Sequence, residues 1–251
     1  MDLRGKVAVV TGGQRGIGKA ITAAYLAAGA KVAVIHNDEQ QHHPSSQLGP
    51  IGPEERFCEL HGDVSQSGRM NVIFGQIGDR WGRIDILVNC AGITERLPLT
   101  ALNESSWERM MAVNLKGQYL CVKETVPLML KAGGGSIINI SSIRARLGFA
   151  SDSCYIAAKG GIESFTRALA VELAGDRIRV NCIAPGAIET DFNRERLQEP
   201  AIRESTLQSI PLGRIGGPDD VAGAALFLAS DLSAFITGVT IPVDGGQLIK
   251  G

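Results

Sequence analysis

The chain has 251 residues, of which 44% are hydrophobic and 20% are charged, and its formal net charge at pH 7 is -1. This length suits one substantial core, which α/β proteins of this size commonly build as a single domain. The balanced charge argues against nucleic acid or an anionic membrane as the main partner. We therefore expect one domain over residues 1–251 whose partner is a small molecule.

The cysteines and histidines give no sign of a disulfide framework or a metal site. The five cysteines are an odd number without Cys-x-x-Cys spacing, which favours reduced, buried thiols in a cytoplasmic protein. His42 and His43 lie in a proline-rich segment without other ligands at useful spacing, so we expect no metal. The first apolar run, residues 7–10, is too short for a signal or membrane segment.

Short apolar runs alternate along the chain with longer stretches compatible with helices. Several runs are nearly continuous Val, Ile and Leu, as in strands buried on both faces of a parallel sheet. The pattern predicts an α/β, single-domain, doubly wound Rossmann fold with a mostly parallel seven-stranded sheet and helices on both faces. Strands are expected at 7–10, 32–36, 56–61, 84–89, 137–140, 179–183 and 239–243, and helices at 16–28, 66–81, 103–130, 152–173 and 219–229.

Three features interrupt this pattern. Residues 37–55 contain three prolines, so the crossover helix expected there must be short or absent. Pro127 is expected to kink the helix at 103–130 or to mark its last turn. Residues 186–212 follow a strand end directly, which is where a substrate lid would lie in a sheet of this kind.

A glycine-rich turn, Thr-Gly-Gly-Gln-Arg-Gly-Ile-Gly, occupies residues 11–18, between the first strand and the first long helix. Glycine permits a tight turn and close backbone approach to a pyrophosphate, and the helix N-terminus offers free N–H groups. The turn therefore predicts a dinucleotide cradle; the alternative is a turn that merely packs.

Tyr155 and Lys159 stand four residues apart in Cys-Tyr-Ile-Ala-Ala-Lys, with Ser142 upstream. On a helix, residues four apart project from the same face. A phenol titrates near 10, and a neighbouring cation favours its ionised form and so brings proton exchange toward neutral pH. Taken alone, the pair could equally lie on a solvated helix face. Together with the glycine-rich turn, the Tyr155 and Lys159 pair indicates a redox enzyme.

The order of these motifs resembles the short-chain dehydrogenase/reductase family over essentially the whole chain. Residues 11–18 are similar to the family's T-G-x-x-x-G-x-G loop, and residues 89–92 to its N-N-A-G segment, with Cys90 in place of the second Asn. Ser142 precedes Tyr155 by thirteen residues, the spacing that the family uses. Further matches are Asp63, the acid that contacts the adenine, Asn114 of the catalytic tetrad, and Pro185, Gly186 and Thr190 of the nicotinamide loop.

The resemblance implies a role for each residue of a catalytic tetrad. Tyr155 exchanges the substrate proton, Ser142 hydrogen-bonds the substrate oxygen, and Lys159 assists Tyr155 and holds the nicotinamide ribose. Asn114 supports a water that links Lys159 to solvent. The implied cofactor-binding residues are Gly12, Gln14, Arg15, Gly16, Ile17, Gly18, His36, Asn37, Asp63, Val64, Asn89, Ala91, Gly92, Tyr155, Lys159, Pro185, Gly186, Ile188 and Thr190.

The substrate itself is the least defined part of the resemblance. Two segments line the substrate mouth in the family: 94–96, which begins at Thr94, and 143–147, which carries Arg144 and Arg146. The arginines there are either solvated or bind a polar, hydroxyl-rich or anionic substrate. Asn193, in Thr-x-x-Asn, favours the aldose 1-dehydrogenase branch. The alternatives are a 3-oxoacyl-thioester (acyl carrier protein) reductase and a catalytically silent binding protein.

Cofactor choice depends on the end of the second strand, where NAD-specific members place an acid. This chain has His36 and Asn37 there, and Asp38 comes one position later. Arg15 is suited to a 2′-phosphate, and the missing acid removes the repulsion that excludes NADP. We expect NADP(H) to be preferred and NAD(H) to be accepted.

The family commonly pairs subunits through two long helices, here 103–130 and 152–173. Val113, Leu120, Ile162 and Leu169 are candidates for their apolar faces, although some of them must point to the monomer core. The resemblance implies a homotetramer.

Overall fold

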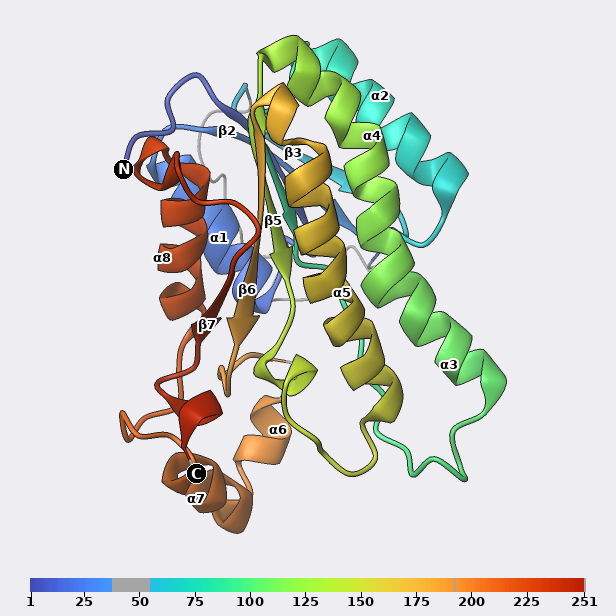
Figure 1. Ribbon diagram of the computed structural model, residues 1–251, viewed down its shortest axis with the longest axis vertical. Coiled ribbons are helices and arrows are strands. Elements are labelled where there is room, and N and C mark those ends of the chain that lie inside the picture. The colour runs from blue at the N-terminus through green and yellow to red at the C-terminus, as the bar shows by residue number, and fades with distance from the viewer. Residues whose placement is uncertain (38–54, 192, 251) are drawn as a thin grey trace.

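The protein is built on one sheet in which every strand pairing is parallel, in the order β3-β2-β1-β4-β5-β6-β7 (Figure 1). The computed structural model describes residues 1–37, 55–191 and 193–250. The seven-stranded, doubly wound prediction is confirmed. The strands are β1 Val7–Thr11, β2 Lys31–His36, β3 Phe57–His61, β4 Ile86–Asn89, β5 Gly135–Ile140, β6 Ile178–Pro185 and β7 Thr240–Val243.

Helices cover both faces of this sheet. Figure 1 shows α1 and α8 on one side, and α2, α4 and α5 on the other. The two sides follow from the crossovers, because each parallel strand pair needs a connection that returns across a face. The main helices are α1 Gly16–Ala27, α2 Ser67–Trp81, α3 Glu104–Met111, α4 Gly117–Ala132, α5 Ser153–Glu172 and α8 Pro218–Ala229.

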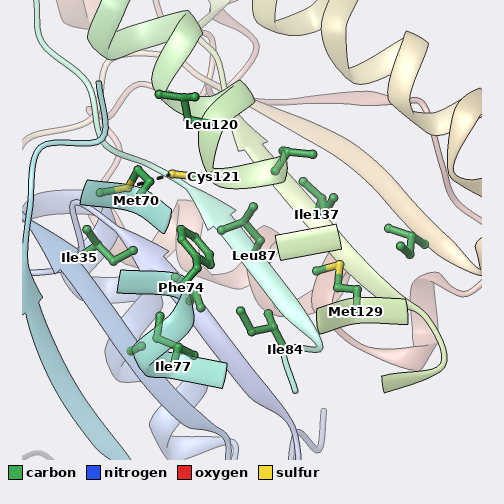
Figure 2. Close-up of a cluster of buried hydrophobic side chains, with 14 of the residues drawn as sticks. Ile35, Met70, Phe74, Ile77, Ile84, Leu87, Leu120, Cys121, Met129 and Ile137 are labelled. Atoms are coloured by element: carbon green, nitrogen blue, oxygen red, sulfur yellow. Dashed lines mark hydrogen bonds between the residues drawn. The ribbon is translucent and has the colours of Figure 1, made fainter. Parts of the chain in front are cut away.

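The central strands are buried on both faces, so the core consists of two apolar clusters with the sheet between them. One lies under α2, α4 and α5 and the other under α1 and α8. Figure 2 shows the first, where Phe74 of α2 lies near Leu87 of β4 and the Cys121 sulfur lies 3.8 Å from that of Met70. Strands that bury both faces need apolar residues at successive positions, which is why their runs are visible in the sequence.

The helix expected at 103–130 is interrupted in the structure. A π-helical segment, Ala112–Lys116, separates α3 from α4. Pro127 lies inside α4, which continues to Ala132, so the expectation that this proline marks the last turn is wrong. The interruption comes instead around Asn114, which is fully buried. π-helical turns inside helices are frequent at functional sites.

Two short helices, α6 Arg194–Leu197 and α7 Pro200–Gln208, follow β6 within the segment expected to form a lid. They lie beyond the end of β6, at the same end of the molecule as the N-terminal end of α5 (Figure 1). Most of the proline-rich segment 37–55, with its predicted short or absent helix, lies outside the described residues. No described helix has the length and apolar character needed to cross a membrane.

Candidate active site

A cavity of about 740 Å³ lies at the carboxyl edge of the sheet. The residues that line it follow β1, β2, β3, β4, β5 and β6, so six successive strand ends contribute. The strand order reverses between β1 and β4, and this reversal is where doubly wound sheets bind their ligands. The cavity is therefore positioned by the topology of the sheet.

The glycine-rich turn forms one wall of the cavity and leads into α1. Gly12 has a φ of +67°, and a Cβ at Gly18 would lie 2.2 Å from the Gly12 carbonyl oxygen, so the turn closes only with glycine at both places. The Thr11 hydroxyl accepts hydrogen bonds from the N–H groups of Cys90 and Ala91 at 3.1 and 3.0 Å. This fixes the turn against the segment after β4 and directs the N-terminus of α1 at the cavity, a geometry that suits a pyrophosphate.

Tyr155 and Lys159 both line the cavity from α5. Lys159 is 4% exposed, and its ammonium donates a hydrogen bond to the Ile140 carbonyl at 2.9 Å. The same ammonium lies 5.5 Å from the centre of the Tyr155 ring. A positive charge is thus held beside the phenol, as the i, i+4 spacing predicts.

Ser142 is held at the end of β5 by the turn that follows it. The Ser142 hydroxyl accepts a hydrogen bond from the Arg144 N–H at 3.2 Å. The neighbouring Ser141 hydroxyl donates to the Lys159 carbonyl at 2.9 Å, which ties the strand end to α5. Two elements far apart in sequence are therefore fixed to each other where Ser142, Tyr155 and Lys159 line one cavity.

Asn114 fixes the loop after β4 with both ends of its side-chain amide. Its Oδ1 accepts from the Ile93 N–H at 3.1 Å, and its Nδ2 donates to the carbonyls of Ile93 and Met110, both at 2.9 Å. A Cβ at Gly92 would lie 2.8 Å from this Oδ1 and 3.7 Å from the Lys159 ammonium. The glycine therefore keeps open the space between the Asn114 carbonyl and Lys159.

The far end of the cavity is formed by the ends of β2 and β3. Arg15, His36 and Asn37 line this part, as does Asp63, whose carboxylate accepts a hydrogen bond from the Ser65 N–H at 2.8 Å. The His36 and His61 rings meet edge to face with their centres 5.7 Å apart. These residues suit an adenosine, and together with the glycine-rich turn they fit a nicotinamide dinucleotide.

Electrostatics makes one cavity residue chemically inert. Burial raises the pKa of the Cys90 thiol to about 11, although the charge of Lys159 opposes the shift. The thiol is therefore neutral at physiological pH and is no nucleophile. Among the described residues, no group of three or more His, Cys, Asp or Glu side chains is arranged to hold a metal ion.

The structure brings most of the predicted site residues together, with three exceptions. Asn89 is buried behind the cavity and donates to Asn139 at 2.9 Å. Arg146 turns away and pairs with Glu163 at 3.0 Å. Asn193 supports the backbone next to the cavity. The predicted residues on the cavity wall are Gly12, Gln14, Arg15, Gly16, Ile17, Gly18, His36, Asn37, Asp63, Val64, Ala91, Gly92, Thr94, Asn114, Ser142, Arg144, Tyr155, Lys159, Pro185, Gly186, Ile188 and Thr190.

Two further arginines, Arg96 and Arg109, lie on the cavity wall. Arg96 ends the segment 94–96 that was expected at the substrate mouth, whereas Arg109 was not predicted. Arg109 lies on α3 and carries no local signal, because its place depends on how α3 lies against the loop after β4.

Known proteins are similar to this chain in both sequence and fold. The family described as enoyl-(acyl carrier protein) reductase matches residues 12–247. A 3-oxoacyl-(acyl-carrier-protein) reductase of Chlamydia pneumoniae is 43% identical over 247 residues, covering 98% of each chain. A D-threitol dehydrogenase of Mycolicibacterium smegmatis is 36% identical over 249 residues, covering 99% of this chain and 95% of its own.

A solved short-chain type dehydrogenase/reductase from Mycobacterium ulcerans has the same fold, with a TM-score of 0.91 and 29% identity over 100% of this chain and 92% of its own. The sequence matches run through the glycine-rich turn, the cavity and the Ser142, Tyr155 and Lys159 cluster. The protein belongs to the short-chain dehydrogenase/reductase family of oxidoreductases.

Proposed function

We infer that the protein interconverts a secondary alcohol and a ketone with a nicotinamide dinucleotide, at the end of the cavity where Ser142, Tyr155 and Lys159 meet. The observation that carries this is the ammonium of Lys159, held beside the Tyr155 ring and next to the strand end that bears Ser142. These groups suit proton transfer to or from a substrate oxygen.

For the reducing direction, a bound reduced nicotinamide would supply the hydride that the carbonyl carbon of the substrate needs. Tyr155 gives its phenolic proton to the carbonyl oxygen, and the products are the alcohol and the oxidised cofactor. Ser142 donates a hydrogen bond to that oxygen and holds it in line. Lys159 stabilises the phenolate that Tyr155 leaves, and Asn114 maintains the opening through which Tyr155 regains a proton by way of Lys159.

A 3-oxoacyl thioester is the substrate that the relatives favour. Two reductases of this type, from Chlamydia pneumoniae and Thermotoga maritima, are 43% and 40% identical to this chain over nearly their whole lengths. The aldose expectation rested on Asn193, but its Oδ1 accepts from the Thr190 N–H at 2.9 Å and its Nδ2 donates to the Ile188 carbonyl at 2.8 Å. The Thr-x-x-Asn piece is thus a local turn and gives no reason to prefer a sugar.

A small polyol is the second candidate substrate. The D-threitol dehydrogenase of Mycolicibacterium smegmatis supports it, and so does the polar wall formed by Thr94, Arg96 and Arg144 at the substrate end. A wall of this kind suits hydroxyl groups better than an acyl chain, because apolar chains gain little from solvated guanidinium groups.

NADP(H) is the proposed preferred cofactor, with NAD(H) accepted. Arg15, His36 and Asn37 line the adenosine end of the cavity, where none of the described residues at the end of β2 is an acid. A guanidinium binds a 2′-phosphate by charge-assisted hydrogen bonds. Asp38 and Glu39, the nearest acids in the sequence, lie outside the described residues.

Three further proposals concern the whole molecule. Residues 186–212, which include α6 and α7, act as the substrate lid, since Gly186 and Thr190 line the cavity at their base. The protein assembles as a homotetramer. It works in the cytoplasm, a location that suits its five free cysteines.

The test is a panel of substrates with the purified protein and either NADPH or NADH, or the oxidised forms, followed by the absorbance of the reduced nicotinamide. A 3-oxoacyl thioester, a polyol, an aldose and a simple ketone form the panel. We expect turnover of the thioester and faster turnover with NADPH. Cofactor binding without turnover of any member would instead support a catalytically silent binding protein.

A further inference from the structure

The substrate end of the cavity carries more positive charge than hydride transfer requires. Arg96, Arg109 and Arg144 all line the cavity, and Arg144 is near enough to Tyr155 and to Arg96 for their charges to interact. The acid on the same wall, Asp191, has its own cation, Arg194, at 2.7 Å. Among the described residues, Arg96 and Arg144 share one buried carboxylate, that of Asp152.

Asp152 holds two of the three arginines in place. Its side chain is 1% exposed, and its carboxylate pairs with Arg144 and, at 3.4 Å, with Arg96. Two positive charges and one negative charge leave one positive charge on this cluster. The side chains of Arg144 and Arg96 are 22% and 38% exposed, so part of each reaches the cavity while the carboxylate stays behind it.

Arg144 is fixed relative to the catalytic serine. It lies in the short helical turn Ile143–Ala145 directly after Ser142, and its N–H donates to the Ser142 hydroxyl at 3.2 Å. Its guanidinium stacks on the Phe149 ring, 4.2 Å from the ring centre. A preorganised guanidinium loses little entropy when it binds a planar anion. The charge is therefore held at a fixed place on the turn that follows Ser142.

The electrostatics of Arg144 agree with an anion as the missing partner. Burial lowers the pKa of its guanidinium, the nearby charge of Arg96 lowers it further, and Tyr155 opposes the shift. Two like charges held together in a partly buried wall raise the free energy of the empty site. An anion in the cavity would relieve this repulsion, whereas a neutral acyl chain would not.

We propose that Arg144 and Arg96 form a carboxylate subsite, so that the enzyme also takes, besides the thioester that its relatives favour, a short hydroxy acid or oxo acid whose reacting carbon lies at Ser142 and Tyr155. This rests on the proposed function, and the hydride and proton transfers are the same. The carboxylate binds Arg144 from the cavity side, opposite Asp152, and takes no part in the reaction. Its role is to select the substrate and to fix its orientation.

Matched pairs of substrates that differ only in charge test this subsite. D-threonate and D-threitol share a four-carbon polyol chain with and without a carboxylate, and 3-oxobutanoate and its methyl ester share one ketone. We expect the enzyme to prefer the acid of each pair by about tenfold or more, since hydrogen bonds to a charged group contribute about 1.5–3 kcal/mol. Preference for the neutral member in both pairs would overturn the proposal.

Variants at position 144 separate charge from structure. Arg144→Gln should lower kcat/KM for the acids by about 10- to 100-fold and for the neutral members by less than about threefold, with Arg144→Lys in between. Arg167→Gln, an exposed change on the far part of α5, is the matched control and should alter neither. Equal losses for acid and neutral members would show that Arg144 only supports the loop.

Binding measurements keep this inference distinct from the proposed function. Calorimetric titration with D-threonate in the presence of NADPH, and with 3-oxobutanoate in the presence of NADP+, pairs each acid with the cofactor form that cannot react with it and so needs no turnover. Loss of acid binding in Arg144→Gln supports the subsite even if no substrate is turned over, in which case only the proposed function fails. An acid that binds the wild type and Arg144→Gln equally well, or binds neither, overturns the subsite even if a neutral ketone is reduced.

Discussion

The ammonium of Lys159 lies 5.5 Å from the centre of the Tyr155 ring, one helical turn further along α5. A hydrogen bond to the carbonyl at the end of β5 holds it there. We therefore propose that this one buried cation both stabilises a phenolate and binds the ribose of the cofactor. This double role gives a prediction that a purely catalytic lysine would not.

Lys159→Ala should reduce turnover and cofactor affinity together. Removing the ammonium leaves the phenolate unsupported and takes a charged donor from the ribose site, which contributes about 1.5–3 kcal/mol. Steady-state kinetics and cofactor titration measure the two effects, and Lys123→Ala on the exposed face of α4 is the control. If Lys159→Ala kept full cofactor affinity, that result would contradict the proposal that Lys159 binds the ribose.

Gly18→Ala should displace the glycine-rich turn and so damage cofactor binding, while leaving the rest of the fold intact. The added Cβ would lie 2.2 Å from the Gly12 carbonyl oxygen, and overpacking of this kind costs about 1–3 kcal/mol. We expect the dissociation constant for NADP(H) to rise at least about fivefold, measured by fluorescence titration.

Gly75→Ala is the matched control for this substitution. Gly75 lies within α2, and nothing lies within 4 Å of a Cβ placed there. Alanine should raise the free energy of unfolding by about 0.5–1 kcal/mol and leave the affinity unchanged. Normal NADP(H) affinity in Gly18→Ala would mean that the turn does not contact the cofactor.

Arg15→Ala should weaken the binding of NADP(H) more than the binding of NAD(H). The arginine lies at the N-terminus of α1 and lines the adenosine end of the cavity, where only NADP(H) carries a 2′-phosphate. A lost charge-assisted contact should raise its dissociation constant about tenfold. Arg167→Ala is the control. Equal losses for both cofactors, or a strong NAD(H) preference in the unmodified enzyme, would refute the assignment.

The mass of the protein in solution should equal that of four chains. Three of the four apolar residues suggested for the helix faces, Leu120, Ile162 and Leu169, are buried in the monomer core and cannot form the contact. Val171 at the end of α5 and Phe235 after α8 are instead 82% and 104% exposed, which is unusual for large apolar side chains.

Light scattering at micromolar concentration tests this assembly. Phe235→Glu should lower the mass, because a charge in an apolar contact is costly. A monomeric mass for the unmodified protein would refute the tetramer.

The sequence predicts the sheet well because buried parallel strands need uninterrupted apolar runs, such as Val-Ala-Val-Ile at residues 32–35 of β2. It predicts the pairing of Tyr155 and Lys159 for the same kind of local reason, since the α-helical repeat alone places them on one face. Both features depend on neighbours along the chain.

Features that depend on distant contacts escape this reasoning. The π-helical segment around Asn114 arises where its amide bonds Ile93, which belongs to a loop after another strand. Arg144 and Arg146 look equivalent in the sequence, yet the short turn after Ser142 sends one to the cavity and the other to Glu163. Only the tertiary structure separates them.

The proton-transfer role of Tyr155 is the central claim, and Tyr155→Phe tests it most directly. The substitution removes the hydroxyl and keeps the ring that lies beside Lys159. The control is Tyr119→Phe, at an exposed tyrosine of α4. Single-turnover hydride transfer should slow by a factor on the order of 10²–10⁴ while NADP(H) affinity stays within about twofold of the unmodified enzyme. Retention of half of the hydride-transfer rate by Tyr155→Phe would contradict the account.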